Sequence, residues 1–158
     1  MTEWIRFNYK QDSSLFGTLV GDYVDEYEGN LFETPKPTGR RISINEVQLQ
    51  APLEPHSIYA LWNNFHERAE KEEQTIPDVP LYFMKPLTSV IGPEQTIFRP
   101  KGHQGRVIFE AELGIVIGSK CREVNESEAA EYIFGYTCVN DVTAVSYTHL
   151  TLPTTPYV

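Results

Sequence analysis

Cysteine is scarce in this sequence. Only Cys121 and Cys138 occur in its 158 residues, which is too few for a disulfide framework or for a zinc site built from cysteines. A cysteine with neither role usually behaves as a small apolar side chain. We therefore expect both cysteines to be buried.

Basic residues and long apolar runs are also scarce. The chain has 13 Lys and Arg residues against 22 Asp and Glu, a formal net charge of −9, which repels nucleic-acid phosphates and anionic lipid surfaces. A role on nucleic acid or at a membrane is therefore disfavoured. No apolar run approaches the roughly 20 residues of a membrane helix, and Met1 to Trp4 does not resemble a secretion signal. The expected location is the cytoplasm.

Short stretches of alternating apolar residues dominate the pattern, which predicts a mainly β protein with a few short helices, of the α+β class. A Pro-rich and Gly-rich stretch at 34–39 predicts a connection. The expected strands include Trp4–Tyr9, Leu15–Val20, Ser57–Leu61, Leu81–Met84 and Tyr136–Asn140.

Two segments have helical character. Residues 65–73 are dense in Glu, Arg, Lys and Ala, which favour helices. Asn125 followed three residues later by Glu128 has the pattern of a helix start and predicts a second helix over 126–134, ended by Gly135.

The strongest local pattern is Val107–Gly118, VIFEAELGIVIG. Its odd positions are all apolar, which predicts one strand with that face packed into a core. Its even positions include Glu110 and Glu112, whose Cα atoms would lie roughly 7 Å apart on one face. Gly114 and Gly118 on the same face indicate a close approach by some other group.

Two neighbouring carboxylates raise each other's pKa unless a positive charge compensates them. If a metal ion compensates Glu110 and Glu112, oxygen-only ligands indicate Mg²⁺, Mn²⁺ or Ca²⁺. Asp141, at the end of the next strand, is the candidate for a third ligand. The alternative is that both glutamates lie on a solvated face, which is common in antiparallel sheets.

His66 is the candidate base. It lies near the start of the first predicted helix, with Glu67 beside it and Glu70 one turn further on, so a histidine–carboxylate pair that activates water is possible. The alternative is an ordinary charged helix surface. Lys85, between a predicted strand and Pro86, is the candidate for binding an acidic substrate. The alternative is a surface lysine that packs its aliphatic stem on apolar neighbours and keeps its ammonium in water.

In combination, these features resemble the fumarylacetoacetate hydrolase family. The resemblance covers roughly residues 57–144. It rests on a strand, a His-bearing helix and three segments: FMKP at 83–86, FEAELGIVIG at 109–118 and GYTCVNDVTA at 135–144. Many members have a Glu three residues after the helix histidine, where this chain has Ala69. Glu67 and Glu70 therefore both remain candidates for the carboxylate that pairs with His66.

The resemblance implies a mixed β-sandwich roll. It also implies a divalent-metal-dependent enzyme that acts on 2-oxo or enol acids through an enolate, by carbon–carbon bond hydrolysis, decarboxylation or isomerisation in aromatic catabolism. Glu110, Glu112 and Asp141 would hold Mg²⁺ or Mn²⁺, and His66 with Glu70 would activate water on a lid helix. A homodimer is compatible with the family. The alternatives are a non-catalytic module that binds metal or oxo acid, and an inactive fragment.

The resemblance also predicts the domain organisation. Residues 1–55 would form a small N-terminal β region and connector, and residues 56–144 the first part of the catalytic domain. Residues 145–158, VSYTHLTLPTTPYV, contain no charged residue and do not match the family, whose members continue with further strands. We expect this tail to be non-native and the roll to be incomplete at its C-terminus.

Overall fold

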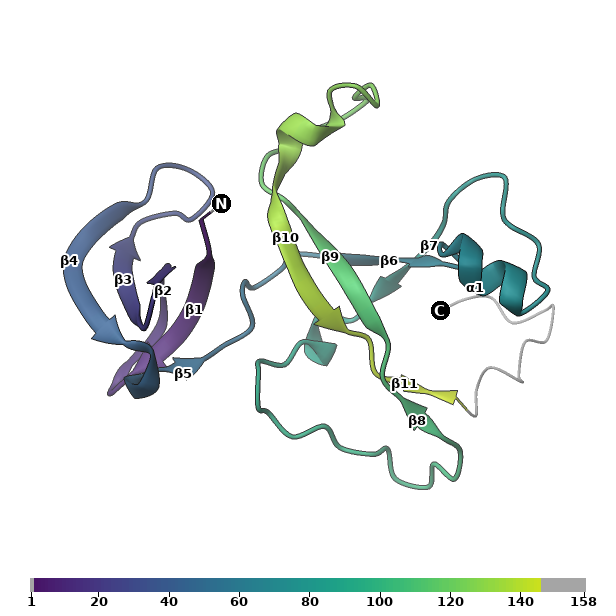
Figure 1. Cartoon of the computed structure of the whole chain (residues 1–158), viewed down its shortest axis with the longest axis horizontal. Helices are drawn as coiled ribbons and strands as arrows, with labels where there is room; N and C mark the ends of the chain where they lie inside the picture. The colour runs from purple at the N-terminus through teal and green to yellow at the C-terminus, as the bar shows by residue number, and fades with distance from the viewer. Residues whose placement is uncertain (1, 146–158) are drawn as a thin grey trace. The chain divides into compact units, whose positions relative to one another are not determined.

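The computed structural model of the chain describes residues 2–145 (Figure 1). It contains two compact units: residues up to Glu28 together with Pro37–Gln95, and Gly29–Lys36 together with residues from Thr96 onward. The tail predicted to be non-native lies outside the described residues, apart from Val145, whose N–H donates to the Arg106 carbonyl at 2.9 Å.

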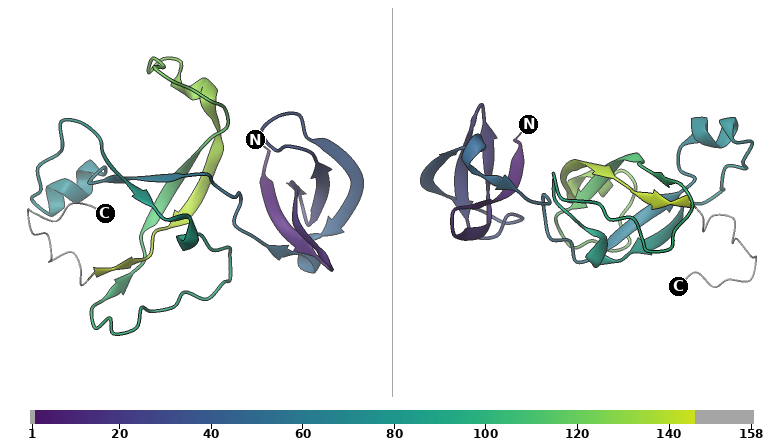
Figure 2. Two further views of the ribbon diagram at one scale, coloured as in Figure 1. Left: turned by 180° about the vertical axis from the view of Figure 1, so that it is seen from behind. Right: turned by 90° about the horizontal axis from the view of Figure 1, so that it is seen from below.

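The N-terminal residues form a five-stranded sheet of order β4-β3-β2-β1-β5. Figures 1 and 2 show it as a strongly curved sheet. Its strands are β1 (Trp4–Tyr9), β2 (Asp12–Val20), β3 (Tyr23–Glu28), β4 (Lys36–Ser43) and β5 (Gln48–Leu49), and a short 3₁₀ helix, η1 (Ile44–Glu46), precedes β5.

The core of this sheet is small and apolar. Phe7 and Val24 are fully buried and Ile42 is 3% exposed. These side chains come from three different strands, and partly buried aliphatic residues such as Ile5 and Leu19 pack around them. The alternation that placed Ile5 and Phe7 on one face of β1 therefore builds the core.

The predicted connection at 34–39 is only partly correct, because β4 begins at Lys36 and contains Pro37. The strand lies at the edge of the sheet, where a residue without an N–H group loses no ladder hydrogen bond. Gly39 has a φ of +84°, which a glycine adopts without strain. The edge position therefore overrides the Pro-rich and Gly-rich composition.

A hairpin follows in the same unit. Strands β6 (Ile58–Trp62) and β7 (Leu81–Lys85) pair antiparallel, and helix α1 (His66–Lys71) lies in the connection between them (Figure 1). The predicted strands and helix are confirmed, although the helix is shorter than 65–73. It ends early because Glu73 has a left-handed φ of +53° and the next residue, Gln74, bonds back to the Ala69 carbonyl. A short 3₁₀ helix, η2 (Leu87–Ser89), follows β7.

The second unit is built on an antiparallel ribbon of β9 (Ala111–Ile117) and β10 (Ile133–Asn140). A shorter pair, β8 (Val107–Ile108) and β11 (Thr143–Ala144), adjoins one end of it, as Figures 1 and 2 show. The single strand predicted over 107–118 is therefore interrupted at Phe109 and Glu110.

The prediction that the odd positions of this strand face a core is wrong for the described residues. Leu113, Ile115 and Ile117 are 54–64% exposed, whereas Glu112 and Val116 on the other face are half-buried. The physical reason is that the described residues place no second layer over this face of the two-stranded ribbon, so its apolar side chains stay exposed.

Two further predictions for this unit are wrong. In place of the helix over 126–134 there is a 3₁₀ helix, η3 (Ala129–Tyr132), because Ile133 already pairs with Ile117 in the ribbon. Cys121 and Cys138 are both exposed. Cys138 lies opposite Leu113 on the exposed face of the ribbon, so the burial expected from its apolar character is not provided there. No helix among the described residues is long and apolar enough to cross a membrane.

Candidate active site

The end of the β9–β10 ribbon brings two of the predicted metal ligands together. Ala111, the first residue of β9, pairs with Asn140, the last residue of β10. Glu110 and Asp141 are the next residues outward, and the Asp141 N–H donates to the Glu110 carbonyl at 2.9 Å. Strand pairing thus places side by side the backbones of two acidic residues that are 31 positions apart in the sequence.

The Glu110 side chain is held by Thr143, a residue that the sequence pattern did not single out. Thr143 Oγ1 donates to Glu110 Oε2 at 2.7 Å, and the Asn140 side-chain oxygen accepts from the Glu110 N–H at 3.3 Å. Asn140 and Thr143 lie within two residues of Asp141, so the signal was present in the segment itself. A hydroxyl that bonds a carboxylate fixes its orientation.

Glu112 lies within β9, opposite Val139, on the half-buried face. The alternative of a fully solvated glutamate face is therefore not supported. The expected close approach at Gly114 is confirmed: a Cβ there would lie 2.9 Å from methyl groups of Thr137 and Val139. What approaches is the side chains of the neighbouring strand.

The side chains of Glu110, Glu112 and Asp141 carry the type of donor atom that a divalent ion binds. All three carboxylates supply oxygen, the ligand that hard cations such as Mg²⁺ and Mn²⁺ prefer. As placed, however, the described residues contain no group of three His, Cys, Asp or Glu side chains arranged to hold a metal. None of Glu110, Glu112 and Asp141 is without a partner. Binding one ion through all three therefore requires their side chains to reorient about the ribbon end.

His66 is the first residue of α1, and Glu70 follows one turn later. Both side chains are exposed, as is Glu67. In the part of the chain that the structure describes, no hydrogen bond joins His66 to either glutamate. The choice between the two carboxylates thus remains a prediction.

The loop that carries α1 is closed at its base. Asn63, with a left-handed φ of +51°, donates its side-chain amide to the Thr75 carbonyl at 3.0 Å. Within the helix, Ala69 is fully buried, and Arg68 pairs with Glu72 at 3.0 Å. The helix is therefore anchored through one small side chain and its loop base, while the His66 side chain is exposed.

Lys85 is the last residue of β7 and pairs with Ile58. It is half-buried, and its Nζ lies 5.2 Å from the centre of the Phe83 ring, within the range of a cation–π contact. Together with His66 and Glu70 it belongs to the first unit, whereas Glu110, Glu112 and Asp141 belong to the second.

Two family models match the chain. The C-terminal domain of fumarylacetoacetate (FAA) hydrolase matches residues 57–155, and the N-terminal domain named Rv2993c-like matches residues 3–52. Among curated proteins, an uncharacterized protein of Archaeoglobus fulgidus is 43% identical over 106 residues, which cover 67% of this chain and 42% of that protein. The chain therefore spans less than half the length of this relative.

Solved structures give the same result. The 5-carboxymethyl-2-hydroxymuconate delta-isomerase from Mycobacterium smegmatis is 32% identical with a TM-score of 0.83, over 96% of this chain and 58% of that one. Maleylpyruvate hydrolase from Sphingobium, solved with manganese(II) and pyruvate, is 21% identical with a TM-score of 0.69, over 92% and 60%, which shows a shared fold. The mainly β fold expected from the sequence is confirmed, and this chain belongs to the fumarylacetoacetate hydrolase family.

Proposed function

We propose that this chain carries part of the active site of a divalent-metal-dependent enzyme that acts on 2-oxo or enol acids. The observation that carries the proposal is the position of Glu110 and Asp141, joined by a backbone hydrogen bond at the ribbon end, with Glu112 two residues along. The names of the isomerase and the hydrolase described above support a reaction on a small oxo or enol acid.

Glu110, Glu112 and Asp141 would hold Mg²⁺ or Mn²⁺, with Ca²⁺ as a further candidate. The bound ion would supply the positive charge that stabilises an enolate as a bond beside the carbonyl breaks. Thr143, which donates to Glu110 Oε2 at 2.7 Å, would remain bonded to that oxygen as the Glu110 side chain turns toward the ion.

The other residues would act on the substrate and on water. The Lys85 ammonium would bind a substrate carboxylate. His66 would accept a proton from water on a ring nitrogen, and the carboxylate of Glu70 or Glu67 would stabilise the charged imidazole. The loop that bears α1 would exclude bulk water when it orders over the substrate, which strengthens every charge interaction beneath it.

Manganese titration followed by calorimetry and by electron paramagnetic resonance tests the metal assignment without requiring turnover. The wild-type chain should take up Mn²⁺, and Glu112→Gln should weaken that uptake by about 100-fold or more, because even residues that only support metal ligands contribute 10- to 100-fold. Glu123→Gln is the matched control, since Glu123 is an exposed glutamate of the same unit that pairs with Arg122. Equal uptake by all three proteins would refute the assignment.

Turnover of an acylpyruvate and of oxaloacetate, with and without Mn²⁺, tests the reaction class. His66→Ala should abolish turnover and leave manganese uptake unchanged.

The second candidate function is a module that binds metal and oxo acid without turnover. The exposed His66, which has no hydrogen bond to Glu67 or Glu70 in the described residues, favours it. Pyruvate binding without any turnover would support this candidate.

A further inference from the structure

The first unit contains a second polar site that shares no residue with the candidate active site. A cleft of about 370 Å³ lies between the N-terminal sheet, the connector after β5 and the segment that follows β7. Among the described residues its charged lining consists of Arg6 and Glu54. The Arg6 side chain is only 13% exposed, whereas the Glu54 side chain is 78% exposed.

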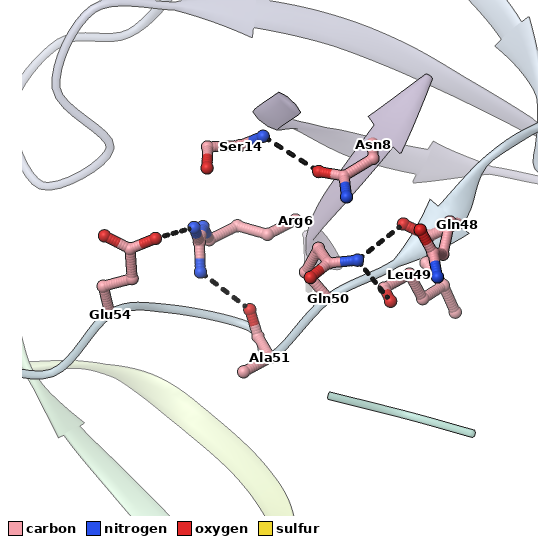
Figure 3. Close-up of polar contacts among 8 residues, drawn as sticks. All are labelled: Arg6, Asn8, Ser14, Gln48, Leu49, Gln50, Ala51 and Glu54. Atoms are coloured by element: carbon pink, nitrogen blue, oxygen red, sulfur yellow. Dashed lines mark hydrogen bonds and ion pairs between the residues drawn. The ribbon is translucent and has the colours of Figure 1, made fainter. Parts of the chain in front are cut away.

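Some of the N–H donors of the Arg6 guanidinium already have acceptors. Its Nη1 donates to the Ala51 carbonyl at 3.1 Å, and its Nη2 pairs with Glu54 Oε1 (Figure 3). A guanidinium carries five N–H donors in a planar fork, so donors remain for a further acceptor. Because the Arg6 side chain is only 13% exposed, its charge acts through a lower effective dielectric than that of an arginine at an open surface.

A distorted stretch of β2 places Ser14 on the same cleft. The register of β1 and β2 shifts between Phe7 and Tyr9, and Ser14 has a left-handed φ of +58°. The Asn8 side-chain oxygen holds this conformation by accepting the Ser14 N–H at 3.0 Å (Figure 3). Such a conformation costs a non-glycine residue about 1–3 kcal/mol and is often found at binding sites.

Aliphatic side chains form part of the cleft lining, beside polar residues such as Gln50 and Gln95. Leu53 and Pro55 line it from the connector, and Leu87, Val90 and Ile91 line it from the segment after β7. The two segments are in close contact, because a Cβ at Gly92 would lie 2.9 Å from the Ala51 nitrogen. Among the described residues, one arginine beside a patch of aliphatic side chains matches a ligand that has one negative group and a short apolar body.

We propose that this cleft binds a small monocarboxylate, whose carboxylate displaces Glu54 from Arg6 and whose apolar body contacts the walls around Leu53 and Val90. The Glu54 side chain already offers Arg6 a carboxylate, which is the same group that the ligand would offer. Glu54 loses little on release, because its side chain is mostly in solvent. A dianion such as phosphate fits less well, since Arg6 is the one cation of the lining among the residues that the structure describes, and the chain carries a net charge of −9.

The test is a titration of the whole ¹⁵N-labelled chain with sodium hexanoate and, separately, with the uncharged hexanamide. Hexanoate should shift the Arg6 side-chain Nε–H and the Ser14 and Gly92 amide signals in a saturable way. Hexanamide should bind at least ~10-fold more weakly, because it lacks the charge that Arg6 recognises. Equal binding of the two compounds would overturn the proposal.

Three variants sharpen the test. Arg6→Gln should abolish hexanoate binding, and Glu54→Gln should strengthen it by about tenfold if Glu54 occupies Arg6 about 90% of the time. Arg41→Gln is the matched control, because it removes an arginine–aspartate pair on the surface of the same sheet, and it should leave the affinity unchanged. If Arg6→Gln does not fold, Glu54→Gln decides: an affinity equal to or below that of the wild type would refute the competition on which the proposal rests.

Discussion

Thr143 and Glu110, 33 residues apart in the sequence, are joined by a 2.7 Å hydrogen bond from the threonine hydroxyl to the glutamate Oε2. Thr143 begins β11 and Glu110 lies between β8 and β9, so the pairing of the two short strands brings them together. If Glu110 is a metal ligand, Thr143 is the residue that orients it.

Thr143→Val should therefore weaken manganese binding by about 10- to 100-fold, the range found for residues that support metal ligands. Thr143→Ser keeps the hydroxyl and should restore most of the affinity. Calorimetry with Mn²⁺ measures both. Thr137→Val is a suitable control, because Thr137 lies on the same ribbon and its hydroxyl contacts only the Cys138 carbonyl among the described residues. Wild-type affinity in Thr143→Val would show that the hydrogen bond does not support a metal ligand.

Asp25 gives a prediction for pH. Arg41 donates two hydrogen bonds to the Asp25 carboxylate, at 2.6 and 2.7 Å, and they lower the pKa of Asp25 below its ordinary value of about 3.8. A folded-state pKa that is depressed means that the pair stabilises the fold above pH 3.8, and that this contribution is lost as the pH falls through the folded-state pKa.

Carbon-detected NMR titration of the Asp25 carboxyl between pH 2 and 6 measures this shift. Arg41→Gln should return the Asp25 pKa to its ordinary range, whereas Arg68→Gln, which removes another surface ion pair, should not change it. High salt should shrink the shift in the wild-type chain, because both side chains reach solvent. An Asp25 pKa that is the same with and without Arg41 would contradict the assigned cause.

Much of the fold could be predicted from local patterns. The alternation at Trp4–Tyr9 and Leu81–Met84 and the Ala-containing, charged stretch after Phe65 each agree with an observed strand or helix. The failures arise where a tertiary contact overrides the local preference. Ile133 joins the ribbon instead of ending a helix, and Pro37 is accepted in a strand because that strand is at a sheet edge.

The candidate site was only partly predictable, for a related reason. The spacing of Glu110 and Glu112 is visible in the sequence, but only Glu112 lies on a strand, because Glu110 falls in the break between β8 and β9. Their approach to Asp141 and Thr143 depends on the register of two antiparallel pairs, which no local pattern fixes. The same holds for the cleft around Arg6, which is formed by segments more than 30 residues apart.

The exposed face of the ribbon predicts how the chain behaves in solution. Leu113, Ile115 and Ile117 form an apolar row, with Tyr136 opposite Ile115 on the neighbouring strand. Rows of this kind promote association between chains. Ile115→Glu should therefore lower concentration-dependent self-association in sedimentation velocity. Ser119→Glu adds the same charge just beyond the row, at an exposed position, and should have a smaller effect. Equal effects of the two substitutions would mean that net charge, and not the row, controls association.

Two glycines of the same ribbon should respond in opposite ways to alanine. A Cβ at Gly114 would lie 2.9 Å from the methyl groups of Thr137 and Val139, whereas a Cβ at Gly135 would meet nothing within 4 Å. Both neighbours of Gly114 are β-branched, so they have little freedom to move aside. We expect Gly114→Ala to lower the free energy of unfolding by about 1–3 kcal/mol.

Gly135→Ala should instead leave that free energy unchanged or raise it by about 0.4–1 kcal/mol, because alanine restricts the unfolded chain. Urea unfolding followed by circular dichroism compares the two variants, which carry the same substitution on the same ribbon. If Thr137 is the obstructing neighbour, Thr137→Ser should rescue part of the loss in Gly114→Ala, since serine lacks the methyl group that a Cβ would meet. Equal stability of Gly114→Ala and Gly135→Ala would show that the two strands are not packed as closely as the ribbon geometry requires.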